Sequence, residues 1–223
     1  MYFFFIYATH STQDHSKALS ALHSNDVSFW VQSQRQAQGR GQRGRKWESI
    51  SGNLFLTCCF PRRKNFSPGQ LSISIGVSLA EILKLFLPKQ HVELKWPNDV
   101  LLNHKKCGGV LIEADDNIYI GIGVNITSHP DNTQMPATHL QAYEPIDINS
   151  LIIKIIDAIP NFEGLENFER MRHQWWSFAK NSLPYWSLRE PVNGTICGID
   201  EYGQLLIQLE NGELTKRHQT FCE

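Results

Sequence analysis

A stretch of glycine and arginine is the feature of this sequence best suited to holding an anion. Residues 39–47 read GRGQRGRKW, so three glycines and four basic side chains precede a tryptophan. Glycine lets the backbone approach a ligand closely and turn its N–H groups inward, and arginine adds paired donors that suit phosphate. The tryptophan adds a flat face for a base. We interpret the segment as a nucleotide-phosphate loop; a basic surface loop is the alternative.

The positive charge of the chain is concentrated around this loop. With 21 Lys+Arg against 22 Asp+Glu, the formal net charge is −1. Between Arg35 and Lys64, however, eight basic residues accompany a single acid, Glu48, so this stretch carries +7 and the rest of the chain −8. A nearly neutral protein that gathers positive charge in one stretch usually binds an anion there.

A lysine at the end of a strand-like segment is the second candidate. In the run KWPND at 95–99, Lys95 follows an alternating pattern in which Val92 and Leu94 are apolar. Alternation turns Glu93 and Lys95 to the opposite face of the strand, and the proline stiffens the turn that follows. A strand-end lysine is usually only solvated, but beside a phosphate loop it becomes a candidate cation.

Two further segments place glycines inside strands. Residues 105–113 read KKCGGVLIE and residues 121–125 read GIGVN, and such glycines allow a ligand or another backbone to come close. Each segment alone is better explained by a bulge or a strand crossing. His104 and Cys107 do not make a metal site, and the five cysteines have no C-x-x-C spacing. We therefore expect neither structural zinc nor a disulfide framework.

Strands and helices alternate along the part of the chain that must position these segments. Apolar runs predict strands at 2–7 (a buried one), 27–31, 53–60, 92–95, 100–102, 109–113 and 118–124. Helices are predicted after an N-cap at Ser11, from Ser67-Pro68 to about Phe86, and at 151–159 and 165–180. Residues 32–46 hold no aliphatic side chain larger than alanine and are predicted as an exposed loop.

The composition changes near residue 184. Residues 193–200, 204–210 and 213–217 predict short strands, and Asn211-Gly212 is the strongest signal for a two-residue hairpin turn, in which both positions need a positive φ. We expect a main domain at 1–183 that contains the binding site, followed by a small β domain at 184–223. At about 40 residues the small domain would be marginal by itself and must pack on the main one.

Size and composition exclude several classes of protein. A chain of 223 residues has room for one full domain and a small appendage, and 41% hydrophobic residues are too many for a disordered chain. The longest apolar run, at 2–8, is far shorter than the ~20 residues of a membrane span and lacks the features of a signal peptide. We expect a reduced, cytoplasmic protein with no membrane partner.

Taken together and in this order, the four segments resemble those of the biotin protein ligases, or biotin–[acetyl-CoA-carboxylase] ligases. That family has Gly-Arg-Gly-Arg-x-Gly-Arg-x-Trp, then Lys-Trp-Pro-Asn-Asp, Lys-x-x-Gly-x-Leu-x-Glu and Gly-x-Gly-x-Asn, with an early Ser-Thr-Asn that corresponds to residues 11–13. The resemblance covers about residues 3–125. It implies an α+β fold, a mixed β-sheet with flanking helices as in class II aminoacyl-tRNA synthetases and biotin/lipoate ligases, plus a small C-terminal SH3-like β-barrel.

The resemblance implies an ATP-dependent ligase. Such enzymes use ATP and Mg²⁺ to convert biotin to biotinyl-5′-AMP, and pass the biotinyl group to a lysine of the biotin carboxyl carrier domain of a carboxylase. The implied catalytic cations are Lys95 and Arg40, with no metal-ligating side chain. The implied biotin-binding residues are Ser11, Thr12, Gln13, Gln36, Arg40, Gly41, Gln42 and Lys95. The implied adenylate-binding residues are Arg43, Arg45, Trp47, Lys106 and Asn125.

The sequence departs from the family pattern at two positions. Gln42 stands where the family has its second loop arginine, and Gln13 stands where it has asparagine. Some members carry a helix-turn-helix domain ahead of the catalytic one; because ten residues precede Ser11, we expect no specific DNA binding. The sequence leaves a homodimer open and does not identify the carboxylase.

Two alternative functions remain at this point. A lipoate or octanoate ligase shares the architecture but lacks the Gly-Arg-Gly loop, and it would need a long apolar pocket. An RNA-binding module would use the basic stretch and bind with a steep salt dependence. Biotin-dependent exchange of pyrophosphate into ATP distinguishes the three.

Overall fold

The computed structural model describes residues 1–22, 27–62, 67–131, 133, 135–159, 168–181, 183 and 194–218. The strands of its large sheet are β1 (Tyr2–Thr9), β2 (Phe29–Gln36), β3 (Leu54–Pro61), β4 (Val92–Lys95), β5 (Asp99–Leu102), β6 (Lys105–Ala114) and β7 (Asn117–Val124). The helices are α1 (Thr12–Ser20), α2 (Pro68–Phe86), α3 (Ile148–Ala158) and α4 (Phe168–Ala179), with short 3₁₀ turns at Gln42–Gly44 and Leu140–Ala142. A small sheet contains β8 (Thr195–Ile199), β9 (Leu205–Gln208) and β10 (Leu214–Arg217).

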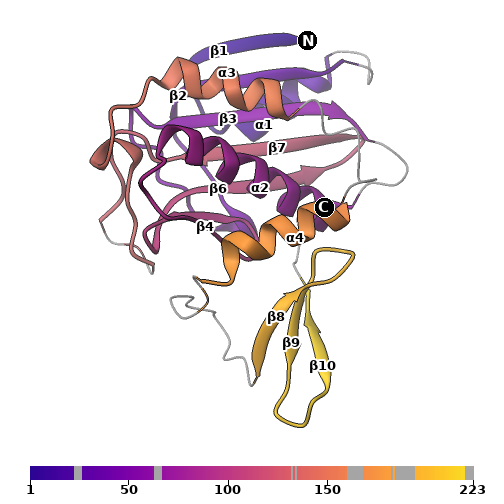
Figure 1. Cartoon of the computed structure of the whole chain (residues 1–223). Coiled ribbons are helices and arrows are strands. Elements are labelled where there is room, and N and C mark those ends of the chain that lie inside the picture. Colours follow the sequence, from indigo (N-terminus) through magenta and orange to yellow (C-terminus); the bar gives the residue numbers. More distant parts are fainter. Residues whose placement is uncertain are drawn as a thin grey trace.

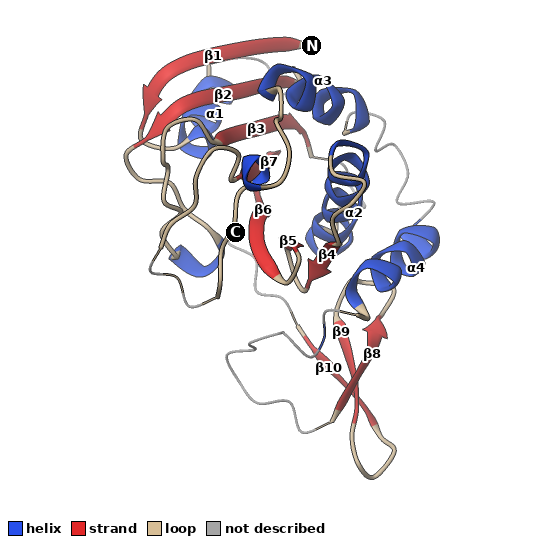
Figure 2. Ribbon diagram, turned by 60° about the vertical axis from the view of Figure 1, so that its left-hand side comes forward, coloured by secondary structure: helices blue, strands red, loops and turns tan. Residues whose placement is uncertain are grey.

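The large sheet is mixed and carries helices on both faces. Its strand order is β1-β2-β3-β7-β6-β5-β4, in which β1 and β2 are parallel and the other neighbouring pairs are antiparallel (Figure 1). Helix α1 lies on one face, and α2, α3 and α4 lie on the other (Figure 2). The small sheet is antiparallel, in the order β10-β9-β8. The predicted mixed sheet with flanking helices and a small C-terminal β unit is confirmed.

Local sequence sets the start of the two helices that matter most. The Ser11 hydroxyl accepts a hydrogen bond from the backbone N–H of Asp14 at 3.2 Å and so caps α1. Ser67 caps α2 in the same way, and Pro68 occupies the first turn, where a missing N–H removes no helical hydrogen bond. Both helix starts are as predicted.

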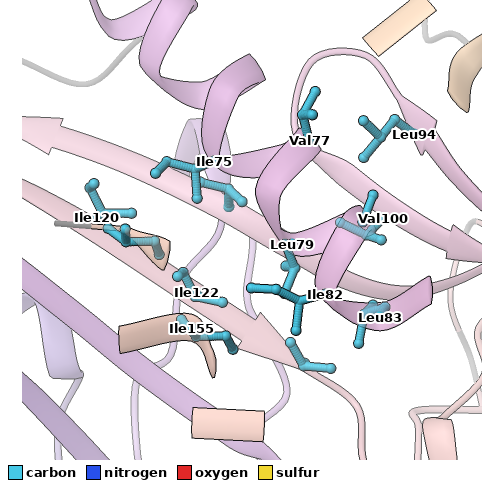
Figure 3. Close-up of a cluster of buried hydrophobic side chains, with 14 of the residues drawn as sticks. Ile75, Val77, Leu79, Ile82, Leu83, Leu94, Val100, Ile120, Ile122 and Ile155 are labelled. Carbon is cyan, nitrogen blue, oxygen red and sulfur yellow. The ribbon is translucent and has the colours of Figure 1, made fainter. Parts of the chain in front are cut away.

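Helix α2 fills the core between the sheet and the outer helices. By length and composition it is, among the described residues, the one helix that could cross a membrane, and 67% of its apolar window is buried inside the fold. Its apolar side chains meet those of the sheet and of α3 in one cluster (Figure 3). The labelled members of this cluster are Ile75, Val77, Leu79, Ile82, Leu83, Leu94, Val100, Ile120, Ile122 and Ile155.

Strand β1 lies at the edge of the sheet, so the prediction that it is buried is wrong. Phe4 and Ile6 pack on a second apolar cluster with Phe29, while Phe5 and Tyr7 are 62% and 65% exposed. An edge strand has one neighbour, and here one face is covered while the other is open. The density of aromatic residues in the sequence does not carry that information.

The turn with positive φ at both positions is not at residues 211–212, where the sequence predicts it. The two-residue turn with positive φ at both positions joins β5 and β6 at Asn103 (φ 49°) and His104 (φ 67°). At residues 211–212 the positive φ is confined to Gly212 (86°), and the Leu209 N–H donates to the Glu213 carbonyl at 2.8 Å to close a longer turn. Strand β2 also continues to residue 36, so the predicted loop begins later than expected.

The turn between β8 and β9 packs the small sheet against the main body. The Gln70 side chain of α2 donates to the Glu201 carbonyl at 2.6 Å, and the buried Trp96 indole donates to the Gly203 carbonyl at 2.9 Å. Residue 184, at which the predicted small domain begins, lies outside the described residues, as do the start of the helix predicted at 165–180 and residues 63, 64 and 222. The two-domain division therefore stays a prediction.

Candidate active site

A cavity of about 310 Å³ opens on the face of the sheet that carries α1. Its walls come from the start of α1, the end of β2, the glycine-arginine loop, the ends of β4 and β10, and the middle of β6 and β7. This volume is within the usual range for small-molecule sites. The structure brings together twelve of the thirteen predicted site residues here: Ser11, Thr12, Gln13, Gln36, Arg40, Gly41, Gln42, Arg43, Arg45, Trp47, Lys95 and Lys106.

Asn125, the thirteenth predicted residue, lies apart from the cavity walls. Its side chain donates to the Thr138 carbonyl at 3.1 Å and its backbone N–H donates to the Cys107 carbonyl at 2.7 Å. The segment that contains Pro136 and Thr138 also pairs with β6, because the Lys106 N–H donates to the Pro136 carbonyl at 2.8 Å. Asn125 thus supports the backbone around Lys106 in this structure.

A buried polar cluster at the start of α1 forms the floor of the cavity. Gln36 Oε1 accepts hydrogen bonds from the Thr12 N–H (2.8 Å) and hydroxyl (3.1 Å), and the Thr57 hydroxyl donates to Thr12 Oγ1 (2.8 Å). Gln13 Nε2 donates to the Leu111 carbonyl at 3.2 Å, while Gln13 Oε1 is buried with no partner in the described part of the chain. A buried acceptor without a partner is costly, so this oxygen is suited to a ligand N–H.

The glycine-arginine loop, residues 39–47, is itself a small hairpin. The Gly41 N–H donates to the Arg45 carbonyl at 2.7 Å, and the Trp47 N–H donates to the Gly39 carbonyl at 2.8 Å. At its tip Arg43 has φ 57°, a left-handed conformation that costs a non-glycine residue roughly 1 kcal/mol. The tip of the loop, residues 43–46, is exposed as predicted, whereas Gly39 is buried and residues 40–42 and 47 are half-buried, and the loop has its own hydrogen bonds.

Glycines of β6 and β7 leave room for side chains of the cavity. A Cβ on Gly123 would lie 2.6 Å from the Trp47 ring, and one on Gly109 would lie 3.5 Å from it. A Cβ on Gly121 would meet the amide of Gln13 at 3.0 Å. The bulge considered for residues 105–113 does occur where β6 pairs with β5. Gly109, Gly121 and Gly123 have a different role, because the absence of a Cβ leaves space for the side chains of Trp47 and Gln13.

Two donors in the cavity walls are buried without a partner among the described residues. They are the indole N–H of Trp47 and the amide nitrogen of Gln42. The Lys106 ammonium lies 5.4 Å from the centroid of the Trp47 ring and pairs with the Asp99 carboxylate at 2.5 Å. The nucleotide side predicted from the sequence thus combines an aromatic face, a cation and two donors without acceptors in the described part of the chain.

Lys95 is 8% exposed at the end of β4. Burial lowers the pKa of Lys95 below that of an ordinary lysine; Asp99 opposes the shift, and Lys106 and Arg45 add to it. Its Nζ lies 3.5 Å from the Sδ of Met135. Three cations therefore act on one another around this part of the cavity.

Arg40 is held by two carboxylates. Its guanidinium donates to both oxygens of Glu113 (Nε–Oε1 and Nη2–Oε2, each 2.8 Å), pairs with Asp14 at 2.7 Å and donates to the Ser11 hydroxyl at 3.1 Å. Hydrogen bonding to Glu113 raises the pKa of Arg40 despite partial burial. Glu113 was visible in the sequence as the last residue of KKCGGVLIE, but nothing there indicated its partner.

The small sheet also reaches the cavity. Arg217, the last residue of β10, and His218 are among its walls. Neither residue is predicted to belong to the site, because the sequence places both in the small β domain and has no motif that connects them to it.

The sequence and the fold match those of known ligases. Residues 5–125 match the model of the "Biotin/lipoate A/B protein ligase family". The biotin–[acetyl-CoA-carboxylase] ligase of Paracoccus denitrificans is 35% identical over 220 residues, 86% of this chain and 89% of that ligase. The bifunctional ligase/repressor BirA of Escherichia coli (strain K12) is 38% identical over 193 residues, 78% of this chain and 59% of BirA.

Two solved structures resemble this one over nearly their full length. The biotin protein ligase of Aquifex aeolicus in complex with biotin and ATP has a TM-score of 0.74 and 25% identity, covering 96% of this chain and 94% of that one. The biotin protein ligase of Leishmania major in complex with biotinyl-5-AMP has a TM-score of 0.70 and 25% identity, covering 97% and 98%. With its motifs, its fold and these matches in agreement, the chain belongs to the biotin/lipoate A/B protein ligase family and, within it, to the biotin protein ligases.

Proposed function

We propose that the protein joins biotin to ATP, forming biotinyl-5′-AMP and pyrophosphate, and then transfers the biotinyl group to a lysine of a biotin carboxyl carrier domain. The observation that carries this proposal is the meeting of three features around one cavity. These are the polar floor at Thr12 and Gln13, the buried ammonium of Lys95, and the glycine-arginine loop.

The polar floor suits the ureido ring of biotin. Gln13 Oε1, which has no partner among the described residues, fits an N–H donor, and the Thr12 hydroxyl, which lines the cavity, can reorient toward a carbonyl oxygen or an N–H. Phe55 and Leu111 line the same cavity and suit the apolar part of the vitamin. A lipoyl or octanoyl chain would leave Gln13 Oε1 without a donor, at a cost of about 1–3 kcal/mol, so the floor favours biotin.

The first step brings two anions together. A carboxylate oxygen of biotin attacks the α-phosphorus of ATP and the bond to pyrophosphate breaks. At ~4 Å and an effective dielectric constant of ~20, one unit charge changes the energy of another by about 4 kcal/mol. A preorganised donor at developing charge typically contributes ~10²–10³ in rate. Lys95 is our candidate for this role, with Lys106 and Arg45 close enough to influence its pKa.

The nucleotide side is assigned to the loop and to β6. We place the adenylate against Trp47, whose indole N–H has no acceptor among the residues that the structure describes, with Lys106, Arg43 and Arg45 toward the phosphates. Gln42 offers an amide donor where the family pattern has arginine. Asn125 acts from outside the walls, by supporting Lys106.

Mg²⁺ is expected to enter with ATP. Of the described residues that line the cavity, Asp99 alone is a carboxylate, and it is paired with Lys106. This donor set fits an ion carried mainly by phosphate oxygens and water. When bound, the ion would supply charge shielding for the leaving pyrophosphate.

In the second step the amine of the carrier lysine attacks the acyl carbon. AMP leaves, an amide forms and one proton is released. The carrier domain as partner follows from membership of the family, and a cytoplasmic location stays a prediction of the cysteine pattern.

Exchange of labelled pyrophosphate into ATP tests the proposal. We expect exchange that depends on biotin and not on lipoate or octanoate, followed by mass-spectrometric detection of one biotinyl group on a carrier domain. Exchange driven by lipoate or octanoate alone would instead identify an acyl ligase of the other type. If no acid supports exchange and the protein binds RNA with a steep salt dependence, the RNA-binding reading is correct.

A further inference from the structure

We propose that Glu113 is a positioning residue: by binding Arg40 it ties the base of the glycine-arginine loop to the sheet, and Arg40 serves as this tie and not as a phosphate ligand. The inference rests on the proposed function and goes beyond it, because it gives a role to a residue outside the predicted site and changes the role of Arg40.

The tie is a neutral cluster of four charges. Glu113, with a side chain only 5% exposed, receives Arg40 at 2.8 Å on each oxygen and Lys17 at 3.0 Å on Oε2. Asp14 binds the remaining side of the Arg40 guanidinium at 2.7 Å. Two cations and two anions therefore cancel, and little of the Arg40 charge is left to attract a phosphate.

Burial by itself would raise the pKa of Glu113. Hydrogen bonds from Arg40 and Lys17 outweigh burial and keep the pKa below its ordinary value, so the carboxylate stays charged. Removing Arg40 would leave this buried charge with a single cation. The two residues should therefore affect the site as a unit.

The cluster connects three elements that form the cavity. Arg40 pairs with Lys46 across the base of the loop hairpin, so a fixed Arg40 fixes where the hairpin leaves the sheet. Glu113 belongs to β6, which pairs with β7 along this length. Asp14 and the Ser11 hydroxyl belong to the first turn of α1, next to the polar floor. The tie thus sets the distance between the floor and the loop.

The two roles for Arg40 predict opposite effects of Glu113→Gln. If Arg40 bound phosphate, loss of the competing carboxylate would leave ATP binding unchanged or improve it. If Arg40 is a tie, the same change loosens the loop. A displacement of about 1 Å in a positioned site can cost as much as 10²-fold, so we expect KM for ATP and the dissociation rate of biotinyl-AMP to rise about 10- to 100-fold.

The test is a double-mutant cycle in the full chain with Glu113→Gln, Arg40→Gln and the double variant. Pyrophosphate exchange gives KM and kcat, and the rate of tryptic cleavage after Arg43 and Arg45 reports loop mobility without any turnover. Glu169→Gln is the matched control, because it removes an exposed carboxylate that binds Arg172 at 2.6 Å on α4. Asp14→Asn replaces Glu113→Gln if the latter does not fold.

We expect each single variant to raise KM for ATP and to speed cleavage about 10- to 100-fold, with the double variant no worse than the worse single one. The Glu169 control should match the wild type. Losses that multiply in the double variant, or an unchanged loop and KM in Glu113→Gln, would overturn the inference. Wild-type protein without biotin-dependent exchange would refute the proposed function instead, and the cleavage rates would still decide the tie.

Discussion

A methyl group at Gly123 tests whether the Trp47 ring must lie on β7 for ATP to bind. The added Cβ would lie 2.6, 2.7 and 3.2 Å from three carbons of that ring, whereas carbon atoms pack at about 3.5–4.0 Å. Gly123 is not among the residues with positive φ, so alanine meets no backbone strain there. The ring must therefore move by about 1 Å or leave its place, while the strand itself is kept.

The cost can be estimated from the contact. Overpacking typically costs about 1–3 kcal/mol. Since about 1.4 kcal/mol corresponds to a factor of ten, the ring should be displaced from its place about 5- to 150-fold more often. Gly123→Ala should raise KM for ATP in pyrophosphate exchange by the same factor. Biotin affinity, measured by calorimetry, should change much less, because the polar floor is untouched.

Gly76→Ala is the matched control for this substitution. Its Cβ would lie 3.7 Å from a Leu94 methyl group, which is ordinary contact, inside helix α2. We expect unchanged KM for ATP and a gain of about 0.5–1 kcal/mol in stability, because alanine favours helix over glycine. If Gly123→Ala folds with its thermal midpoint intact and keeps the wild-type KM for ATP, the adenylate does not depend on the position of Trp47.

Three further predictions concern Lys95, Glu113 and Trp96. Lys95→Ala should lower the single-turnover rate of adenylate formation about 10²–10³-fold. Because burial lowers the pKa of Lys95, wild-type kcat/KM should also fall as alkaline pH removes this charge, and it should do so at a lower pH than for an exposed lysine. If the same alkaline decrease in kcat/KM persists in Lys95→Arg, it belongs to another group. The pKa of Glu113 is lower in the folded chain than in the unfolded one, so the stability it contributes is present above about pH 4.5 and is lost as pH falls through the depressed value. Below about pH 4.5, the thermal midpoint of Glu113→Gln should therefore depend less on pH than that of the wild type. Parallel plots of thermal midpoint against pH for the two proteins would contradict this. Trp96→Phe removes the donor to the Gly203 carbonyl and should weaken the attachment of the small sheet to the main body by about 1–3 kcal/mol. The measurement is amide hydrogen exchange at residues 200–208, which should become faster. Unchanged exchange would mean that packing alone holds the small sheet.

Features that depend on neighbouring residues could be predicted from the sequence. The cap at Ser11 and the start at Ser67-Pro68 follow from hydrogen bonds between residues three apart. The orientation of Lys95 follows from strand alternation, which sends Leu94 into the core and leaves the lysine to line the cavity. The resemblance between motifs then brought segments far apart in the chain into one site.

Features that depend on tertiary packing could not be predicted. Arg40 and Glu113 are 73 positions apart, and one sequence contains no record of their pairing. The open face of β1 depends on which strand lies at the edge. Met135 contacts Lys95 and Arg217 lines the cavity, and the local sequence pattern of neither segment connects it to the site. In each case the missing information is the arrangement of elements, which local propensity does not set.

The basic stretch shows why counting charges is a weak guide to what they do. Its eight cations suggest one large anion site. In the structure, Arg62 donates to the Asp115 carbonyl between β6 and β7, outside the cavity walls, and Arg35 is also outside them. Arg40 is neutralised by its carboxylate partners. The cations of this stretch that are described and line the cavity without such a tie are those at the loop tip: Arg43, Arg45 and Lys46.

The base and the tip of the glycine-arginine loop carry charges in different states. Charges at the base are already paired, so they fix the hairpin before any ligand arrives. Charges at the tip are exposed, on a turn that holds Arg43 in a left-handed conformation. A triphosphate would give acceptors to those side chains and to the Gln42 amide nitrogen, which has no partner in the described part of the chain, and the strained tip could adjust while its base stays in place. An ordered base and an adaptable tip are what closure over a water-sensitive adenylate requires.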